Sequence, residues 1–599
     1  MKTTIDDLKK ELEMLPKGSL TKKHINGKTY YYLQWKENGK SKSKYIKEDE
    51  IDEIKSVIAH RNNIKKQIAV LKKEKISHLS DVNYMMNVTV STNLKKLVNS
   101  SVYPERRNCY SSIEKFLYGK TTPRICSIYG LRRTGKTTLL HQLIYNMSKD
   151  AFDHSAYIKA KKGQTMNMLD KDLQTLADQG YKYIFIDEIT FLEDFVDTAS
   201  ILSDIYAAMG LKIVISGTDS LGLWLANNEE LYDRAYMVHT TWIPFNEHAR
   251  LLNTTDIDDY ISYGGTLRVG ESDFDDPELI GEEASFRDDE STRKYIDTAI
   301  CKNIQHSLRC YENGSRFMHL EELYNEGELT NAINRIIESM NHRFLLSVLI
   351  KDFKSNDLSL AQKNLLRERD LNLRTDILER IDKKVVTDKL KSILDIFNQN
   401  LAKIKVTEIH VREIKDYLKA LDLIESCPIR YYDSNQDEGE NILIMQPGMR
   451  YCQAKALVFA LMKDKEFAEL NENEKKYVTD KILDEVKGRM MEEIVLIETK
   501  KLLPKRYEVF KYQFLGGEFD MVIYDTLENK CSIFEIKHST EMIKDQCKHL
   551  LNDKVCSEME SRIAPITDKH VIYRGNNIDS AWGIGYINVT DYLKSLTEV

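Results

Sequence analysis

The sequence has few of the residues that interrupt regular structure, with 9 prolines and 25 glycines among 599 residues. Average proteins contain about 5% proline and 7% glycine, so this scarcity argues against long disordered tracts and an all-β fold. No stretch approaches the roughly 18 consecutive apolar residues that span a bilayer, and residues 1–7 lack the apolar segment of a secretion signal. We therefore expect a helix-rich α/β protein of the cytoplasm with no membrane segment.

The sequence also lacks the cysteine spacing of a metal or disulfide framework, and it has no excess of positive charge. Its 9 cysteines form no Cys-x-x-Cys pair, which is typical of buried thiols in a reducing compartment. The 87 Lys and Arg against 94 Asp and Glu give a net charge of −7. This excludes a uniformly basic nucleic-acid coat but is compatible with a local basic patch. The length predicts roughly three to five domains.

The first 75 residues have the pattern of a small module. A stripe of apolar residues at helical spacing opens it: Ile5, Leu8, Leu12 and Leu15. Two Asn-Gly turns, at 26–27 and 38–39, then predict a three-stranded β-meander over about residues 22–46. A second helix is predicted from about 48 to 75, and we expect it to pair with the first as a short antiparallel coil.

The predicted meander combines many lysines with aromatic residues and a single acid, Glu37. Two interpretations remain open. The lysines could follow a phosphate backbone while the rings stack on bases, or they could form a solvated face over an aromatic sheet core. The residues concerned are Lys17, Lys22, Lys23, Lys28, Lys36, Lys40, Lys42, Lys44 and Lys47, with Tyr30, Tyr31, Tyr32, Trp35 and Tyr45.

The rest of the chain divides by pattern into five further segments. Short apolar strands at 125–129, 183–186 and 211–215 indicate a parallel sheet. A helix at 411–423 followed by strands at 424–430 and 441–446 has the outline of a winged helix. We expect a linker at 76–100, an α/β domain at 101–270, a helical region at 271–400, a winged-helix-like domain at 401–465 and a second α/β domain at 466–599.

Residues 130–137 satisfy the phosphate-binding pattern G-x-x-x-x-G-K-[ST] between an apolar strand and a helix. Glycines let backbone amides surround phosphates, and the helix N-terminus adds a favourable dipole. Lys136 is expected to reach the β- and γ-phosphates of ATP, and the Thr137 hydroxyl to ligate Mg²⁺. The residues predicted to contact the nucleotide in this loop are Gly130, Arg133, Thr134, Gly135, Lys136, Thr137 and Thr138.

A second nucleotide motif ends the strand at 183–186. Asp187 is expected to hold Mg²⁺, and Glu188 to orient and deprotonate the attacking water, which favours hydrolysis over binding alone. Ser216 follows a third strand, where it could sense the γ-phosphate, although hydroxyl residues after strands are also ordinary turn formers. Arg234 is a candidate finger for a neighbouring site, although a lone arginine is more often a surface residue.

A third group of polar residues lies in the C-terminal segment. Asp520 begins one apolar strand, and Glu535 and Lys537 lie on the same side of the next, because side chains repeat every second residue. A helix beginning near 488 could add Glu492. Two or three carboxylates with a lysine predict a Mg²⁺ or Mn²⁺ site for phosphodiester hydrolysis, with Asp520 and Glu535 as ligands. Glu-x-Lys on an exposed strand is also common without function.

Nine motifs, taken in their order along the chain, together resemble those of a known group of proteins. They are Gly130 to Thr138, Phe185 to Glu188, Ser216 to Ser220, Arg234, Pro244 to Glu247, Tyr263 to Gly265, Gly488 with Glu492, Glu518 to Asp520, and Glu535 to Lys537. They are similar to prokaryotic AAA-type ATPases with a winged helix and a C-terminal restriction-endonuclease-like (PD-(D/E)xK) domain of unknown function. The resemblance implies catalytic roles for Asp520, Glu535 and Lys537, with Glu492 as the helix acid. This sequence departs from the family pattern at Thr266-Leu267, where the family usually has an aromatic residue and a proline.

The leading hypothesis is an ATP-hydrolysing protein coupled to a metal-dependent nuclease that acts on DNA, with a setting in prokaryotic defence or mobile-element control taken from the resemblance alone. The alternative is a nucleotide-switched signalling or partner-binding ATPase whose C-terminal fold is a non-catalytic scaffold. A third option is an oligomeric remodeller of proteins, which requires Arg234 to reach across subunits. A homo-oligomer or a protein partner is compatible with each.

Overall fold

The computed structural model describes residues 5–25, 28–37, 40–78, 83–99, 104–192, 194–218, 222–223, 226, 230–267, 286, 288–310, 317–354, 406–431, 439–463 and 471–596. The chain forms two compact units, Met1–Tyr84 and Met85–Val599, which are described separately. Among the described helices, none combines the length and apolar character needed to cross a membrane.

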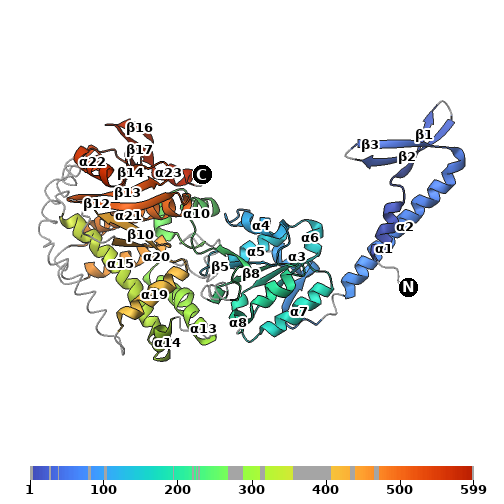
Figure 1. The fold of residues 1–599 in the computed structure, drawn as a ribbon, viewed down its shortest axis with the longest axis horizontal. Helices are drawn as coiled ribbons and strands as arrows, with labels where there is room; N and C mark the ends of the chain where they lie inside the picture. Colours follow the sequence, from blue (N-terminus) through green and yellow to red (C-terminus); the bar gives the residue numbers. More distant parts are fainter. Residues whose placement is uncertain are drawn as a thin grey trace. The chain divides into compact units, whose positions relative to one another are not determined.

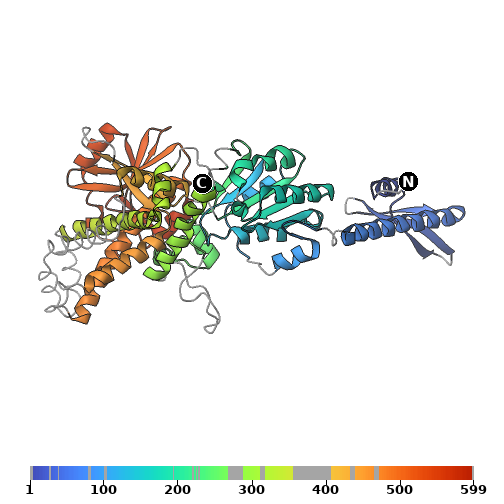
Figure 2. The same ribbon diagram turned by 90° about the horizontal axis from the view of Figure 1, so that it is seen from below.

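The N-terminal unit is a β-meander with two helices. Its elements are α1 (Ile5–Met14), β1 (Ser19–Ile25), β2 (Lys28–Glu37), β3 (Lys40–Ile46), a 3₁₀ turn (Glu48–Glu50) and α2 (Ile51–His78). The strands pair antiparallel in the order β1-β2-β3, as expected from the Asn-Gly turns. Leu33 and Ile46 pack with Ile51 of α2, which runs along the meander (Figure 2). His60 on α2 pairs with Glu11 on α1 at 2.9 Å, so the two helices pack as predicted.

The second unit begins with a six-stranded sheet in the order β4-β6-β7-β8-β5-β9. All neighbours are parallel except the edge strand β4. The strands are β4 (Asn87–Val90), β5 (Ile125–Tyr129), β6 (Ser155–Lys159), β7 (Tyr183–Asp187), β8 (Lys212–Gly217) and β9 (Ala235–His239). The three strands expected from sequence are thus β5, β7 and β8.

Helices cover both faces of this sheet (Figure 1). The chain moves outward from β5 to β6 and then back to β7, and right-handed crossovers therefore put α5 and α7 on opposite faces. The helical elements are α3 (Ser91–Asn99), α4 (Tyr110–Tyr118), α5 (Lys136–Tyr145), α6 (Lys149–Asp153), α7 (Met166–Asp178), a 3₁₀ turn (Ile189–Phe191), α8 (Phe195–Thr198) and a π-helix (Leu202–Ala207). Leu94 of α3, Ile113 of α4 and Leu140 of α5 share one core.

The segment 76–100, expected to be a linker, is largely part of this fold. β4 pairs with β6, and α3 buries Leu94 and Val98. The backbone of Met85 and Met86 donates to the Asp172 carboxylate on α7, at 2.9 and 2.8 Å. These contacts are long-range, which is why local composition did not reveal them, and the boundary between the units lies at 84/85 instead.

The C-terminal half is built on an eight-stranded mixed sheet in the order β11-β10-β12-β13-β14-β15-β17-β16. Its strands are β10 (Ile424–Tyr431), β11 (Gly439–Ile444), β12 (Tyr507–Phe514), β13 (Gly517–Asp525), β14 (Lys530–Lys537), β15 (Ile566–Tyr573), β16 (Ile578–Ala581) and β17 (Ile584–Asn588). The helical elements around it are α20 (Pro447–Met462), α21 (Glu472–Leu502), a 3₁₀ turn (Lys544–Cys547), α22 (Asp553–Arg562) and α23 (Val589–Ser595).

The predicted winged helix differs from what is observed. The expected helix is α19 (Glu408–Ala420), and the two expected strands are β10 and β11. However, β10 also pairs in parallel with β12, through Ile429 and Lys511. The ribbon therefore extends the C-terminal sheet instead of standing as the wing of a separate domain at 401–465. Pairing between residues 82 positions apart, such as Ile429 and Lys511, leaves no local signal in the sequence.

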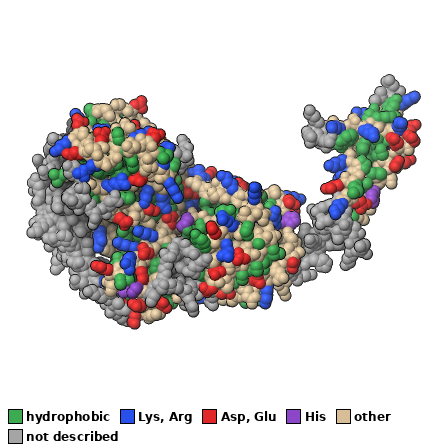
Figure 3. All heavy atoms as spheres, in the orientation of Figure 1, with side chains coloured by type: hydrophobic (Ala, Val, Ile, Leu, Met, Phe, Trp, Pro, Cys, Tyr) green, Lys and Arg blue, Asp and Glu red, His purple; other side chains and the backbone are tan. Residues whose placement is uncertain are grey.

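Helices connect the two sheets of the second unit. They are α10 (Phe245–Leu252), α11 (Ile257–Tyr263), α12 (Asp289–Ile296), a π-helix (Asp297–Cys301), α13 (Lys302–Cys310), α14 (Met318–Asn325) and α15 (Leu329–Lys354). The described part of the predicted helical region is thus helical, and residues 355–400 lie outside the description. On the face shown in Figure 3, acidic and basic side chains are interspersed over this unit, consistent with the absence of a uniformly basic coat.

The helices α10 and α11 pack into the same core as α20, α21 and strands β12 to β14. The Phe245 amide at the start of α10 donates to Glu498 Oε1 on α21 at 2.5 Å. Asp258 on α11 contacts three basic side chains of the C-terminal half: His538, Lys487 and Arg574. The ATPase sheet and the C-terminal sheet are therefore joined by hydrogen bonds and ion pairs as well as by apolar packing.

Glu498 makes the stability of this junction depend on pH. Burial raises the pKa of its carboxyl from 4.5 to about 8, so the folded protein retains a proton that the unfolded chain releases. The contribution is complete below pH 4.5 and is lost as the pH rises through about 8. We expect Glu498→Gln to raise the thermal midpoint relative to the parent at pH 9, by a stabilisation on the order of a few kcal/mol, and to change it little at pH 5. Glu472→Gln, exposed on the same helix, is the control. An equal shift at both pH values would contradict a protonated Glu498.

Candidate functional sites

The loop between β5 and α5 has the backbone geometry of a phosphate cradle. β5 lies between β8 and β9, while the next strand in sequence, β6, lies further out. This reversal of strand order puts the loop at a topological switch point, where α/β sheets bind ligands. Gly130 (φ 156°) and Gly135 (φ 83°) adopt positive φ values. A Cβ at Gly130 would lie 2.3 Å from Thr240 Oγ1, so only glycine fits there.

Lys136 is buried inside the loop at the first residue of α5. Its Nζ donates to the carbonyl oxygens of Gly130 and Leu131, both at 2.8 Å. Burial lowers the pKa of Lys136 to about 8, and the carboxylates of Glu188 and Asp187 oppose that shift. A desolvated ammonium at a helix N-terminus attracts the phosphates of a nucleotide strongly.

Three hydroxyl groups orient the Asp187 carboxylate. Thr137 Oγ1 and Tyr157 OH donate to Oδ2, at 2.9 and 2.8 Å. Ser216 Oγ donates to Oδ1 at 2.5 Å. The Thr137 hydroxyl and the Asp187 carboxylate are adjacent oxygen donors of the kind that Mg²⁺ prefers, so these residues fit the predicted ion. Ser216 is fully buried and orients Asp187, and its role as a sensor of the γ-phosphate stays a prediction.

Glu188 follows Asp187 with a left-handed backbone conformation, φ 58°. Its Oε2 accepts from the backbone amide and the hydroxyl of Thr218, at 3.1 and 2.8 Å. Thr218 thus holds the candidate catalytic base by two hydrogen bonds across the ends of neighbouring strands. Thr218 is part of the Ser-Gly-Thr motif seen in the sequence, but only the fold pairs it with Glu188.

The back of the loop rests on Arg107, a residue that the sequence did not single out. Arg107 is buried, and its guanidinium donates to the carbonyl oxygen of Thr134 at 2.5 Å and to Glu247 Oε1 at 2.5 Å. The Arg133 carbonyl accepts from the Leu267 amide at 2.9 Å. These contacts hold the loop from residues more than 20 positions away, so no local pattern predicts them. Thr138 is half-buried on α5.

Arg234 lies at the other end of the sheet. It immediately precedes β9, which runs parallel to β5, so Arg234 is at the strand start while the phosphate loop follows the strand end. Its Nε pairs with Asp204 at 2.9 Å and its NH1 donates to the Glu230 carbonyl. Arg234 is therefore not a ligand of its own chain's nucleotide. Its role as an arginine finger for the nucleotide site of a neighbouring subunit stays a prediction.

The C-terminal sheet carries a second site, the acidic cluster, formed by Glu492 on α21, Glu518 and Asp520 on β13, and Glu535 with Lys537 on β14. One carboxylate oxygen each of Glu492, Glu518 and Asp520 lies within 4.8 Å of the others, a spacing that could hold a metal ion. Lys537 Nζ is 2.8 Å from Asp520 Oδ2 and 2.7 Å from Glu535 Oε2. The structure thus brings together all four residues predicted from the sequence.

The carboxylates whose spacing could hold a metal ion are not the predicted pair, Asp520 and Glu535. They are Glu492, Glu518 and Asp520, whereas Glu535 contacts Lys537. Burial raises the pKa of Glu535 to about 8 in spite of Lys537, and its Oε1 has no hydrogen-bond partner among the described residues. A buried carboxylate oxygen without a donor beside three other carboxylates fits a site that takes a divalent cation.

Two further cations at the acidic cluster were not anticipated. Lys511 Nζ lies 3.3 Å from Glu492 Oε2, and Arg489 pairs with Glu492 and with Glu518, the latter at 3.4 Å. Lys511 sits at a register shift between β12 and β13, a feature that sequence patterns do not reveal. Glu518 could have been found, because it lies two residues before Asp520 in the same strand.

The loop, Lys136, Thr137 and Asp187 on a parallel sheet define a P-loop nucleotide-binding protein. Residues 122–249 match the model of a family described as an AAA domain, so the chain carries an AAA-type ATPase core that binds ATP. Residues 1–56 match a second family model, described as a domain of unknown function (DUF6788). No curated protein matches the chain.

Two solved structures are similar to this chain over much of its length. One is the S. cerevisiae Hsp104-ADP complex, at 12% identity and a TM-score of 0.22, covering 68% of this chain and 57% of that chain. The other is the Aeropyrum pernix ORC1 protein in complex with DNA, at 13% identity and a TM-score of 0.20, covering 63% and 93%. This chain therefore spans less than two thirds of the Hsp104 chain, and TM-scores this low transfer no function.

Proposed function

We propose that this protein hydrolyses ATP at the P-loop and cleaves phosphodiester bonds of DNA at the acidic cluster. The observation that carries the nuclease assignment is Lys537, whose ammonium contacts both Asp520 and Glu535 beside the three-carboxylate group. Carboxylates that can hold Mg²⁺ next to a lysine suit phosphodiester hydrolysis. The resemblance of Asp520, Glu535 and Lys537 to the PD-(D/E)xK pattern supports the same assignment.

At the nucleotide site, Lys136 neutralises the β- and γ-phosphates, and Thr137 and Asp187 would hold Mg²⁺, whose charge would offset that of the phosphates. Glu188 orients the attacking water and receives its proton as the water oxygen bonds to the γ-phosphorus and the bond to the ADP oxygen breaks. Thr218 fixes the orientation of the Glu188 carboxylate by donating to its Oε2, at 2.8 Å from the hydroxyl.

At the acidic cluster, Glu492, Glu518 and Asp520 would hold Mg²⁺ or Mn²⁺, and such an ion lowers the pKa of bound water. The Ile536 amide and Lys537 both donate to Asp520 Oδ2, at 2.8 Å, and orient that carboxylate. The Lys537 ammonium would neutralise charge on a phosphate oxygen as the water oxygen bonds to phosphorus and the bond to the leaving ester oxygen breaks. Glu535 holds the lysine through its own carboxylate.

A chain of direct contacts supports coupling between the two sites. Arg107 joins the Thr134 carbonyl in the phosphate loop to Glu247 on α10. The first residue of α10, Phe245, donates to Glu498 on α21, and α21 also carries Glu492. A shift of α10 on nucleotide binding would therefore act directly on the helix that supplies one carboxylate of the acidic cluster.

The meander of the N-terminal unit is the proposed nucleic-acid contact. Tyr32 is paired across the sheet with Tyr45, and Tyr30 with Lys23, so these side chains share a face. The opposite face carries Leu33 and Ile46 against α2. Tyr45 is 49% exposed, and the Lys23 ammonium lies 5.0 Å from the Tyr32 ring centre. Exposed rings beside lysines favour base stacking with phosphate contact.

Replacing Tyr30, Tyr32 and Tyr45 together by Ala is expected to weaken binding of a single-stranded DNA 20-mer by roughly tenfold or more, because stacking contributes about 1–3 kcal/mol per base. Fluorescence anisotropy at fixed salt measures the change. The matched variant replaces the same residues by Phe, which keeps the rings, and we expect it to bind nearly as the parent does. Equal affinity of the Ala variant would instead support the solvated lysine face over an aromatic core.

The nuclease assignment is tested by incubating linear and supercoiled DNA with the protein and Mg²⁺ or Mn²⁺, with and without ATP. Metal-dependent cutting that responds to ATP is the expected result. No cutting under any of these conditions, with ATP hydrolysis intact, would favour the second candidate function, a nucleotide-switched ATPase that binds a partner. The observation behind that alternative is that Lys511 and Arg489 already neutralise Glu492, as in a structural ion network.

A further inference from the structure

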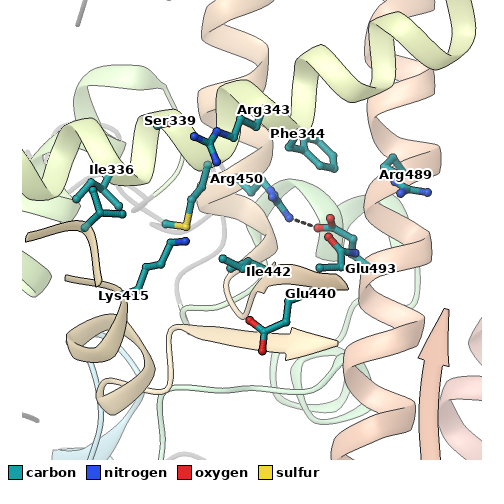
Figure 4. Close-up of a pocket in the computed structure, with 13 residues that line it drawn as sticks. Ile336, Ser339, Arg343, Phe344, Lys415, Glu440, Ile442, Arg450, Arg489 and Glu493 are labelled. Atoms are coloured by element: carbon teal, nitrogen blue, oxygen red, sulfur yellow. Dashed lines mark hydrogen bonds and ion pairs between the residues drawn. The ribbon is translucent and has the colours of Figure 1, made fainter. Parts of the chain in front are cut away.

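A cavity of about 400 Å³ lies among helices α15, α19, α20 and α21 and strand β11 (Figure 4). Its volume is within the range of small-molecule sites, roughly 300–1,000 Å³. It belongs to neither site described above, and the only residue it shares with the contacts of the acidic cluster is Arg489.

Four cations line this cavity, and two of them are already paired. Arg450 forms a buried ion pair with Glu493, and Arg489 pairs with Glu492 and Glu518. The other two, Arg343 on α15 and Lys415 on α19, have no ion pair within the described residues. Figure 4 shows these two side chains extending toward the same space from different helices. Two unpaired cations that converge on one cavity favour an anionic ligand.

The other walls of the cavity carry a carboxylate and apolar side chains instead of cations. Glu440 on β11 lines the cavity with a carboxylate, which donates nothing but accepts a hydrogen bond from Ser426. Met340 and Ile442 add half-buried apolar surface. A ligand that matches all three walls carries an anionic group, a hydrogen-bond donor and a flat or apolar body. A nucleotide has this combination in its phosphate, its hydroxyl and amino groups, and its base.

We propose that this cavity binds one nucleoside monophosphate unit, with the phosphate against Arg343 and Lys415. Arginine is well suited to phosphate because its planar guanidinium can donate two parallel hydrogen bonds. The unit is either a free nucleotide or the 5′-terminal nucleotide of a strand, and both present the same chemistry. The binding goes beyond the proposed function and does not depend on cleavage by the acidic cluster.

A coupling follows from Arg489, and this part does rest on the proposed metal site. Arg489 lines the cavity and at the same time neutralises Glu492 and Glu518, two of the three candidate metal ligands. A phosphate in the cavity attracts the guanidinium away from these carboxylates and leaves them to a cation. Because linkage is reciprocal, the nucleotide and the divalent ion are expected to raise each other's affinity.

The test uses the full-length protein carrying Lys136→Ala, so that the P-loop does not contribute, with AMP, GMP and a 5′-phosphorylated DNA trinucleotide as probes in EDTA. Isothermal titration calorimetry is expected to detect binding of at least one probe, and Arg343→Ala with Lys415→Ala to weaken it by roughly tenfold or more. The matched control is Arg412→Ala with Lys419→Ala, two exposed cations of α19 outside the cavity. Preference for AMP or GMP over the trinucleotide identifies a free nucleotide as the occupant, and the reverse identifies a strand end.

Absence of binding by all three probes at millimolar concentration overturns the proposal, as does binding that the Arg343/Lys415 variant leaves unchanged. Asp520→Asn, which removes a candidate metal ligand, is expected to leave nucleotide binding in EDTA intact. A protein that binds the probes through Arg343 and Lys415 but never cuts DNA would therefore refute only the nuclease. For the coupling, Mn²⁺ affinity is measured with and without AMP, and equal values overturn the role of Arg489.

Discussion

Replacing Glu188 by Gln is expected to lower the rate of ATP hydrolysis by roughly 10²- to 10⁴-fold, the usual contribution of a general base, while ATP still binds. Gln keeps the size of the side chain and can still accept from Thr218 through its amide oxygen, so the strand ends stay in place. It cannot take a proton from water. The measurement is phosphate release under saturating ATP, together with ATP affinity by calorimetry.

Lys136→Ala provides the complementary result. This variant is expected to lose ATP affinity as well as turnover. It removes the Lys136 ammonium, which is the one buried cation inside the phosphate loop among the described residues. Lys171→Ala, exposed on α7, is the control and should hydrolyse ATP as the parent does. Unchanged hydrolysis in Glu188→Gln would move the role of base to another group and contradict the proposed mechanism.

The second large effect concerns the acidic cluster. Asp520→Asn is expected to reduce metal-dependent DNA cleavage by roughly 10³-fold, since Asp520 contributes to the three-carboxylate group and also accepts from Lys537, and the loss of an electrostatic group in an active site has this size. Glu535→Gln is expected to act in the same direction by releasing Lys537. The measurement is the rate of conversion of supercoiled to nicked and linear DNA.

Two controls keep this result interpretable. Glu541→Gln changes an exposed glutamate shortly after β14 and should cut normally. ATP hydrolysis by Asp520→Asn reports whether the variant is folded, because the ATPase core shares its unit with the acidic cluster. Cleavage that survives in both Asp520→Asn and Glu535→Gln would exclude the acidic cluster as the nuclease. Cleavage that disappears in Lys136→Ala alone would show that ATP controls it.

The chain of contacts that runs from the phosphate loop through Arg107 and α10 to α21 gives these experiments a further outcome. If nucleotide acts through α10, Glu498→Gln is the variant that separates coupling from catalysis, because Glu498 touches neither site and accepts from the first amide of α10. The difference in stability between the parent and this variant depends on pH, because the Glu498 carboxyl of the parent has a pKa of about 8. That dependence distinguishes a change in the junction from a change at either site.

The local features of this protein were determined by its sequence alone. The phosphate loop, the strands β5, β7 and β8, the meander with its two helices and the Glu535–Lys537 pair all follow from spacing within a few residues. At such distances, backbone geometry decides which side chains share a face or a turn. The roles assigned to Lys136, Thr137 and Asp187 needed nothing more than the motif and its flanking elements.

Only the tertiary structure decided which distant residues complete these features. It joined β10 to β12, added β4 to the ATPase sheet and packed α3 against it, paired Ser216 with Asp187, and placed Arg234 beside Asp204. It also added Arg107 behind the loop and Lys511 and Arg489 beside Glu492. Each of these contacts depends on how whole elements pack, and the free energy of that packing is spread over many apolar residues, so no single motif in the sequence encodes it.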